Sequence, residues 1–171
     1  WGALSQYQQQ LRQRFQLLAN ERYSRIEERF QDQEQRLDGL RRFFANSESV
    51  SRAEFDGYTQ PLLMRTQAYS FALKVNGAER AAFEQRVRDE GLSNFSLREL
   101  NAQGELQLAG VRDEYVPVLY SQTQSRLGSP LGYDLLAQPL RRDTLQRADK
   151  RGGLAVSQPM HLVSVEPAYA R

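Results

Sequence analysis

A long run of helical periodicity opens the chain, from residue 3 to residue 46 of 171. Apolar or aromatic residues recur there in steps of mostly three and four, and Gln, Arg and Glu, which are good helix formers, stand between them. A helix of this length spans roughly 60 Å, which is longer than a compact domain needs. Its apolar stripe therefore has to pack against a partner helix or a folded domain. The stripe consists of Leu4, Tyr7, Leu11, Phe15, Leu18, Ile26, Phe30, Leu37, Leu40 and Phe44.

Periodicity alone leaves two interpretations of this helix open. Arg22 and Gln33 occupy two positions of the stripe, and an interrupted heptad is a weak signal for a coiled coil. In the first interpretation the helix covers its own domain. In the second it is a stalk that forms a homodimer through residues 4–44 and carries a signal towards a membrane. We predict the homodimer, because the stripe is too long for a domain of this size to cover.

Composition excludes several classes of function. The formal net charge is only +2, and Arg and Glu are interleaved, so we expect no nucleic-acid partner, which would need a clustered basic face. The chain has no cysteine and a single histidine, His161, which we interpret as a structural residue. Asp113 and Glu114 are a poor acid–base pair, because adjacent strand residues point to opposite faces. We therefore expect no catalytic residue, no metal site and no cofactor.

Residues 47–93 form a helical connection in this interpretation. Ser51 and Glu54 have the spacing of a capping box at the start of a short helix. Pro61 opens a second helical stretch that runs through Val75 and is closed by Gly77. Residues 79–90 read as a third helix.

From Asn94 onward the apolar period changes to two, which indicates strands. The segment "VRDEYVPVLY" (111–120) predicts a strand over residues 114–120, with Pro117 at an edge or bulge. A helix is expected over 139–151, with Gly152 at its end, and strand-like segments over 154–157 and 160–165. The predicted fold class is α+β: a long N-terminal helix, then short helices and a small, mostly antiparallel sheet.

Five blocks, in this order, resemble the CHASE family of extracytoplasmic sensory domains, which occur in cytokinin receptors, bacterial sensor histidine kinases and diguanylate cyclases. The resemblance covers residues 55 to 159. The blocks are "FDGYTQPLLMRTQA", "ERAAFEQRVRDEGLSNFSLRE", "VRDEYVPVLYSQ", "LGYDL" and "LRRDTLQRADKRGGLAVSQP".

The resemblance implies a stalk and dimerisation helix (1–46), the helical connection (47–93) and a PAS-like ligand-sensing module (94–171). We expect that module to be incomplete at its C-terminus, because the family's domain continues with further strands and a transmembrane helix. The implied function is to bind a small molecule on the periplasmic or extracellular side of a membrane-anchored receptor. That receptor would be a histidine kinase, a diguanylate cyclase or a phosphodiesterase. A structural dimerisation or spacer domain without a ligand is the alternative.

The resemblance also implies a ligand site. Asp134, in "LGYDL", matches an aspartate that contacts the adenine ring in cytokinin receptors, and a carboxylate can accept hydrogen bonds from a ligand's NH groups. Val118 and Tyr120 share the strand face that meets the pocket, and Val156 and Ser157 match the opposite wall. The alternative for Asp134 is that it caps a helix or binds backbone in a turn.

Overall fold

The structure is a computed structural model and describes residues 2–124 and 130–160. Contacts between residues divide the chain into two compact units, Trp1–Ser49 and Val50–Arg171. Each unit is described by itself below.

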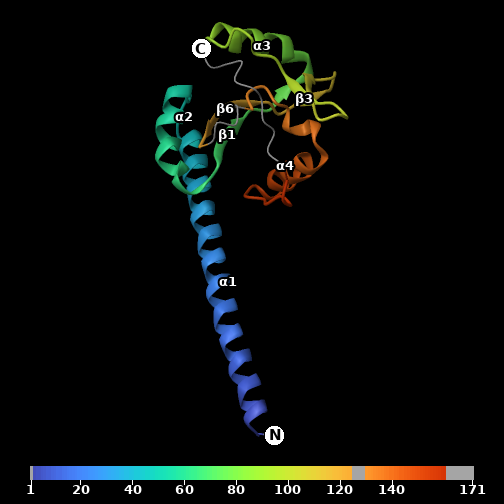
Figure 1. Cartoon of the computed structure of the whole chain (residues 1–171). Coiled ribbons are helices and arrows are strands. Elements are labelled where there is room, and N and C mark those ends of the chain that lie inside the picture. The colour runs from blue at the N-terminus through green and yellow to red at the C-terminus, as the bar shows by residue number, and fades with distance from the viewer. Residues whose placement is uncertain (1, 125–129, 161–171) are drawn as a thin grey trace. The chain divides into compact units, whose positions relative to one another are not determined.

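The first unit is one helix, α1 (Gly2–Ala45), which confirms the long helix expected from the periodicity (Figure 1). No proline interrupts it, and Gly39 is tolerated within it. Ion pairs one turn apart support its polar surface, each worth about 0.2–0.5 kcal/mol on a helix. They join Glu21 to Arg25, Asp32 to Arg36 and Asp38 to Arg41.

The described part of the second unit, residues 50–124 and 130–160, contains three α-helices and three short 3₁₀ helices. The α-helices are α2 (Arg52–Thr59), α3 (Arg80–Asp89) and α4 (Pro139–Arg151). The capping box is confirmed, since the Ser51 hydroxyl accepts from the Glu54 N–H and the Glu54 carboxylate accepts from the Ser51 N–H. Gly152 ends α4 in the left-handed conformation, as its position predicts. The 3₁₀ helices are η1 (Gln60–Arg65), η2 (Gly77–Glu79) and η3 (Leu135–Ala137).

Among the residues that the structure describes, six short strands form three antiparallel pairs, so the α+β class is confirmed. β1 (Ala68–Ala72) lies beside β6 (Val118–Thr123), as Figure 1 also shows. β2 (Val75–Asn76) pairs with β5 (Glu114–Tyr115), and β3 (Arg98–Leu100) pairs with β4 (Leu106–Leu108). Isolated bridges join Arg98 to Tyr133 and Pro117 to Asp134, so the segment before η3 meets two of these pairs.

The helix expected from Pro61 to Val75 is wrong. Pro61 begins only the short η1, and β1 and β2 follow it. The ladder partner of β1 is β6, about fifty residues further along the chain, and the Ser70 and Ser121 hydroxyls form a hydrogen bond across the pair at 2.9 Å. This long-range pairing overrides the local spacing of the apolar residues.

Pro117 divides the expected strand 114–120 into β5 and β6. Proline has no N–H to donate, but its carbonyl accepts from the Leu73 N–H at 3.2 Å. A register shift lies opposite, between Phe71 and Ala72, where the partners change from Tyr120 to Val118. Pro117 therefore lies at an irregularity of the ladder, as its chemistry requires.

The core of the second unit lies between α3 and the strands. Phe83 of α3 meets Phe95 edge to face, with 5.9 Å between the ring centroids. Residue 77 has to be glycine, because the backbone of another segment passes close to it. A Cβ on Gly77 would lie 2.1 Å from the Arg112 carbonyl oxygen. Gly77 is thus required by its neighbour and does not end a helix. The cluster consists of Val75, Phe83, Val87, Phe95, Leu97, Ala109, Tyr115, Val118, Leu119 and Leu131.

The strand expected over residues 154–157 is also wrong, because the chain after α4 has no regular structure through Met160. Val156 is 61% exposed, and its carbonyl accepts from Arg147 at 3.1 Å. The segment has no ladder partner among the described residues. The further strand expected over 160–165 lies, apart from Met160, outside the described residues, as does His161.

Candidate functional site

Asp134 lies at the start of η3 and is fully buried. Its Oδ1 accepts hydrogen bonds from the backbone N–H groups of Val116 (2.9 Å) and Leu136 (3.1 Å), and its Oδ2 accepts from Arg112 at 2.8 Å. One carboxylate therefore caps η3, holds the turn between β5 and β6, and pairs with a cation. This is the cap-and-turn role that the sequence left as an alternative to ligand contact.

Arg112 joins this carboxylate to a second one. Its guanidinium contacts Glu99 of β3 as well as Asp134, and its side chain is 31% exposed. Burial opposes ionisation of Glu99, but hydrogen bonds from Arg112 and Gln107 offset that effect, so the pKa of Glu99 is lowered. Two carboxylates around one guanidinium tie β3 to the segment before η3.

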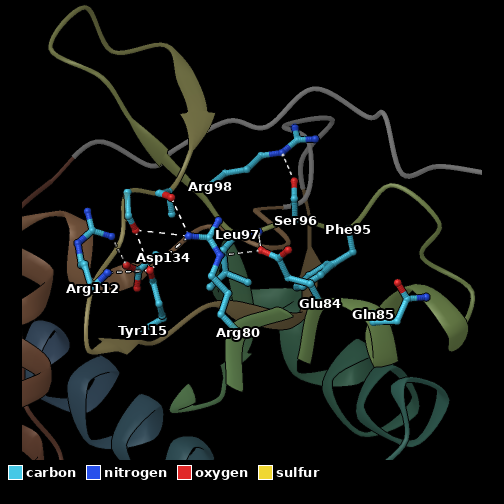
Figure 2. A network of polar contacts seen from close by, with 12 residues as sticks. Arg80, Glu84, Gln85, Phe95, Ser96, Leu97, Arg98, Arg112, Tyr115 and Asp134 are labelled. Atoms are coloured by element: carbon cyan, nitrogen blue, oxygen red, sulfur yellow. Dashed lines mark hydrogen bonds and ion pairs between the residues drawn. The ribbon is translucent and has the colours of Figure 1, made fainter. Parts of the chain in front are cut away.

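A second polar cluster lies beside the first and is centred on Arg80 of α3 (Figure 2). Arg80 pairs with Glu84 at 3.0 Å and donates to the Ala109 carbonyl at 2.8 Å. Glu84 accepts from the Leu97 N–H at 2.9 Å, so the helix is bonded to the segment before β3. Burial opposes the charge of Arg80, but its hydrogen bonds to Tyr115 and Glu84 offset this and raise its pKa.

Tyr115 connects the two clusters. Its hydroxyl accepts from Arg80 at 3.3 Å and from the Arg112 N–H at 2.8 Å, and it donates to the Gly110 carbonyl at 2.8 Å. Arg80, Glu84 and Tyr115 are the central residues that sequence reasoning missed. The spacing of Arg80, Glu84 and Arg88, four residues apart on one helix face, is the signal that could have found part of the network.

Val118 and Tyr120 lie on β6 at different depths. Val118 is buried in the core, and its N–H donates to the Tyr133 carbonyl at 3.0 Å. Tyr120 is half-buried: its ring stacks on Phe71 with 5.7 Å between centroids, and its hydroxyl donates to the Val50 carbonyl at 2.9 Å. Burial is the main cause that raises the pKa of the Tyr120 hydroxyl. Of these two side chains, that of Tyr120 is the more accessible.

The predicted ligand residues differ widely in burial, and the structure does not enclose Asp134 and Val156 in one buried pocket. Asp134 is completely enclosed, whereas Val156 is largely exposed on the irregular segment after α4. Ser157 is half-buried, and its hydroxyl donates to the neighbouring Gln158 carbonyl at 2.9 Å. Ligand contact by these five residues stays a prediction.

Among residues 2–124 and 130–160, no three or more His, Asp or Glu side chains form a group that could hold a metal ion. Within the same residues, no helix has the length and apolar character of a membrane span.

Comparison with known families identifies the class of the chain. A family model described as the CHASE domain matches residues 48–169, which include α2 and every later element of the second unit. The chain belongs to the CHASE family. CHASE domains are non-catalytic sensory domains on the extracellular or periplasmic side of membrane receptors. No curated protein matches the chain.

Proposed function

We propose that this chain is the ligand-sensing domain of a membrane-anchored signalling receptor and that it binds a small molecule outside the cytoplasm. The observation that carries the proposal is the CHASE match over residues 48–169. The receptor's output is a histidine kinase, a diguanylate cyclase or a phosphodiesterase. The full-length protein is then a signalling enzyme, and this domain supplies the control of that enzyme.

Transmission runs through a homodimer formed by residues 4–44. A ligand shifts the balance between two arrangements of that dimer only if it binds them with different affinity. The long exposed stripe of α1 supports this step, since Phe15 is 73% exposed and Ile26 is 55% exposed in the single chain.

The proposed ligand contacts are Asp134, Tyr120, Val118, Val156 and Ser157. The buried carboxylate adds a condition on the ligand's chemistry. Oδ1 of Asp134 already accepts two backbone N–H groups, so a ligand group would have to share or replace Arg112 at Oδ2. An amine or another NH donor satisfies this condition, and an anionic group does not.

Thermal-shift screening tests the ligand step. The wild-type chain and a version extended beyond Arg171 are screened against adenine-like compounds, amino acids and carboxylates. We expect at least one compound to raise the melting temperature saturably, because a ligand that binds only the folded state stabilises it. Replacing Tyr120 with Phe, which removes only the hydroxyl, reports whether that hydroxyl contributes to binding. If the libraries give no saturable shift while the dimer is intact, the alternative below is favoured.

The alternative is a dimerisation and spacer domain without a ligand. Two observations support this alternative. The Asp134 carboxylate already accepts three hydrogen bonds from its own chain, and Val156 is exposed. Both functions need the α1 dimer, so only ligand binding separates them.

A further inference from the structure

Tyr120 of β6 contacts the start of α2 through both its hydroxyl and its ring. The hydroxyl donates to the Val50 carbonyl at 2.9 Å. The guanidinium carbon of Arg52 lies 5.0 Å from the centroid of the ring, which is a cation–π distance. The ring of Phe55, which is completely buried, lies 5.6 Å from that of Tyr120. One side chain of the sheet therefore holds three residues in and just before the first turn of α2.

The start of α2 is itself bonded into one piece. Ser51 lies between Val50 and Arg52 and forms the capping box with Glu54. The Ser51 N–H and hydroxyl donate to the Glu54 carboxylate at 2.8 and 2.7 Å. A capping box fixes the backbone at a helix N-terminus. A shift of Tyr120 therefore acts on the first turn of α2 as a whole.

Val50 directly follows the first unit (Trp1–Ser49), which contains α1. Within that unit, Ser47 bonds back to α1, since its hydroxyl donates to the Phe43 carbonyl at 2.8 Å. Two residues separate Ser47 from Val50. A connection of this length spans at most about 11 Å from Cα to Cα. A displacement of Val50 is therefore passed to the end of α1 through a very short piece of chain.

The other end of β6 is bonded to the segment that carries Asp134. The Val118 N–H donates to the Tyr133 carbonyl at 3.0 Å, and the Val118 carbonyl accepts from the Gly132 N–H at 2.8 Å. Tyr120 is two residues further along this strand. The hydrogen bonds thus continue from the segment of the candidate ligand residue, through β6, to the residue that follows the first unit.

We propose that Tyr120 is the positioning residue that couples β6 to the start of α2 and, through Val50, to α1. Its ring sets where α2 begins on the sheet, and its hydroxyl holds Val50 in place. The transmission of a ligand signal by this route rests on the proposed function, whereas the anchor at Val50 does not.

Hydrogen exchange of the backbone amides, measured by mass spectrometry on the full chain, tests the anchor. Tyr120→Phe removes the hydroxyl and keeps the ring. We expect it to raise the exchange rate of residues 50–55 about two- to tenfold, which is the effect of losing one hydrogen bond of ordinary strength, and to leave β1 and β6 unchanged. Ser121→Ala is the matched control. It removes the neighbouring hydroxyl of β6, which bonds to Ser70 at 2.9 Å, and should leave residues 50–55 unchanged.

Two results would overturn the anchor. In the first, residues 50–55 of Tyr120→Phe exchange at the wild-type rate. In the second, exchange rises by the same factor throughout the second unit, which would mean that the hydroxyl serves general stability only.

A double-mutant cycle tests the transmission. Asp134→Asn loosens the pair with Arg112 and keeps an oxygen for the Val116 N–H. We expect it to raise the exchange rate of residues 50–55 at least twofold in the wild-type background and to have no effect on them in the Tyr120→Phe background. Circular dichroism confirms that each variant is folded. If Asp134→Asn does not fold, Arg112→Lys, which loosens the same pair, takes its place.

Equal rises in both backgrounds would show a route that bypasses Tyr120. No rise in either background would show that β6 does not pass the change on. Each of these results overturns the transmission and leaves the anchor standing. Neither experiment uses a ligand or depends on the dimer, so both outcomes are separate from the success or failure of the proposed function.

Discussion

Asp134, which is predicted to contact a ligand, also bonds to three groups of its own chain. Its two oxygens accept three hydrogen bonds, from Arg112, Val116 and Leu136, without any exposed surface. The sequence identified the residue and its two alternative roles. It could not choose between them, because Arg112 lies 22 residues away and no local pattern pairs it with Asp134.

Replacing Asp134 with Ala tests this structural role. We expect a loss of about 2–4 kcal/mol in the free energy of unfolding, because two backbone N–H groups lose their acceptor and the half-buried Arg112 loses one of its two carboxylate partners. Urea denaturation measures it. Asp113→Ala, which removes an exposed carboxylate, is the matched control and should change stability by less than about 0.5 kcal/mol. If the Asp134→Ala protein is stable but no longer binds a compound found in the screen, Asp134 contacts the ligand and the fold does not require it.

Glu99 gives stability a dependence on acid pH. Its pKa is lower in the folded chain than in the unfolded one, so its contribution is present above the unfolded value of about 4.3 and is lost as the pH falls through the lower, folded value. Glu99→Gln should therefore cost about 1–2 kcal/mol at pH 7 and clearly less at pH 3. Denaturation of both proteins at the two pH values measures the difference. An equal cost at both pH values would mean that the Arg112–Glu99 pair contributes through shape rather than charge.

Two glycines with nearly the same backbone conformation separate strain from crowding. Gly104 and Gly132 have φ of +80° and +79°, but a Cβ on Gly132 would lie 2.3 Å from the Ser96 carbonyl oxygen, whereas one on Gly104 meets open space. Gly104→Ala should cost about 1–2 kcal/mol from strain alone. Gly132→Ala should cost about 1–3 kcal/mol more, because the Ser96 backbone must move. Similar melting temperatures for the two variants would contradict the close approach of the chain at Gly132.

At the scale of elements, the sequence predicted correctly those features that depend on residues close together in the chain. The boundaries of α1, the capping box of α2 and the glycine end of α4 follow from residues within one turn of each feature. β1 was predicted as a helix, because Met64, Ala68 and Phe71 have helical spacing and the strand's partner lies far away in sequence. The strand prediction for residues 154–157 was wrong for a related reason. An alternating pattern forms a strand only where a neighbouring strand pairs with it, and this segment has no such partner among the described residues.

Arg22 occupies a polar position in the apolar stripe of α1. In a homodimer formed through that stripe, its charged guanidinium group loses hydration at the interface, which weakens the dimer. Arg22→Leu should therefore tighten the dimer several-fold, as measured by sedimentation equilibrium. Gln13→Leu, on the opposite face, is the control and should leave the dissociation constant unchanged. A weaker dimer in Arg22→Leu would show that Arg22 makes a favourable contact across the interface.

At the scale of the whole molecule, the family and the fold class could be predicted from the sequence, because five separate blocks carry the resemblance. The candidate site could be predicted only in part. Its residues were named from matched positions, but burial decides which of them a ligand can touch, and burial depends on the packing of the entire second unit. Tyr120, half-buried on β6, is the member that combines an accessible ring with a polar group.

The central claim is that ligand binding changes the arrangement of a dimer formed by α1. The most direct measurement is the rate of disulfide formation in Phe15→Cys and Ile26→Cys, with and without a saturating amount of the compound that gives the largest thermal shift. The account predicts that the compound changes at least one of these rates, since it must favour one arrangement of the helices over the other. Identical rates at both positions, with binding confirmed by calorimetry on the same proteins, would contradict transmission through α1.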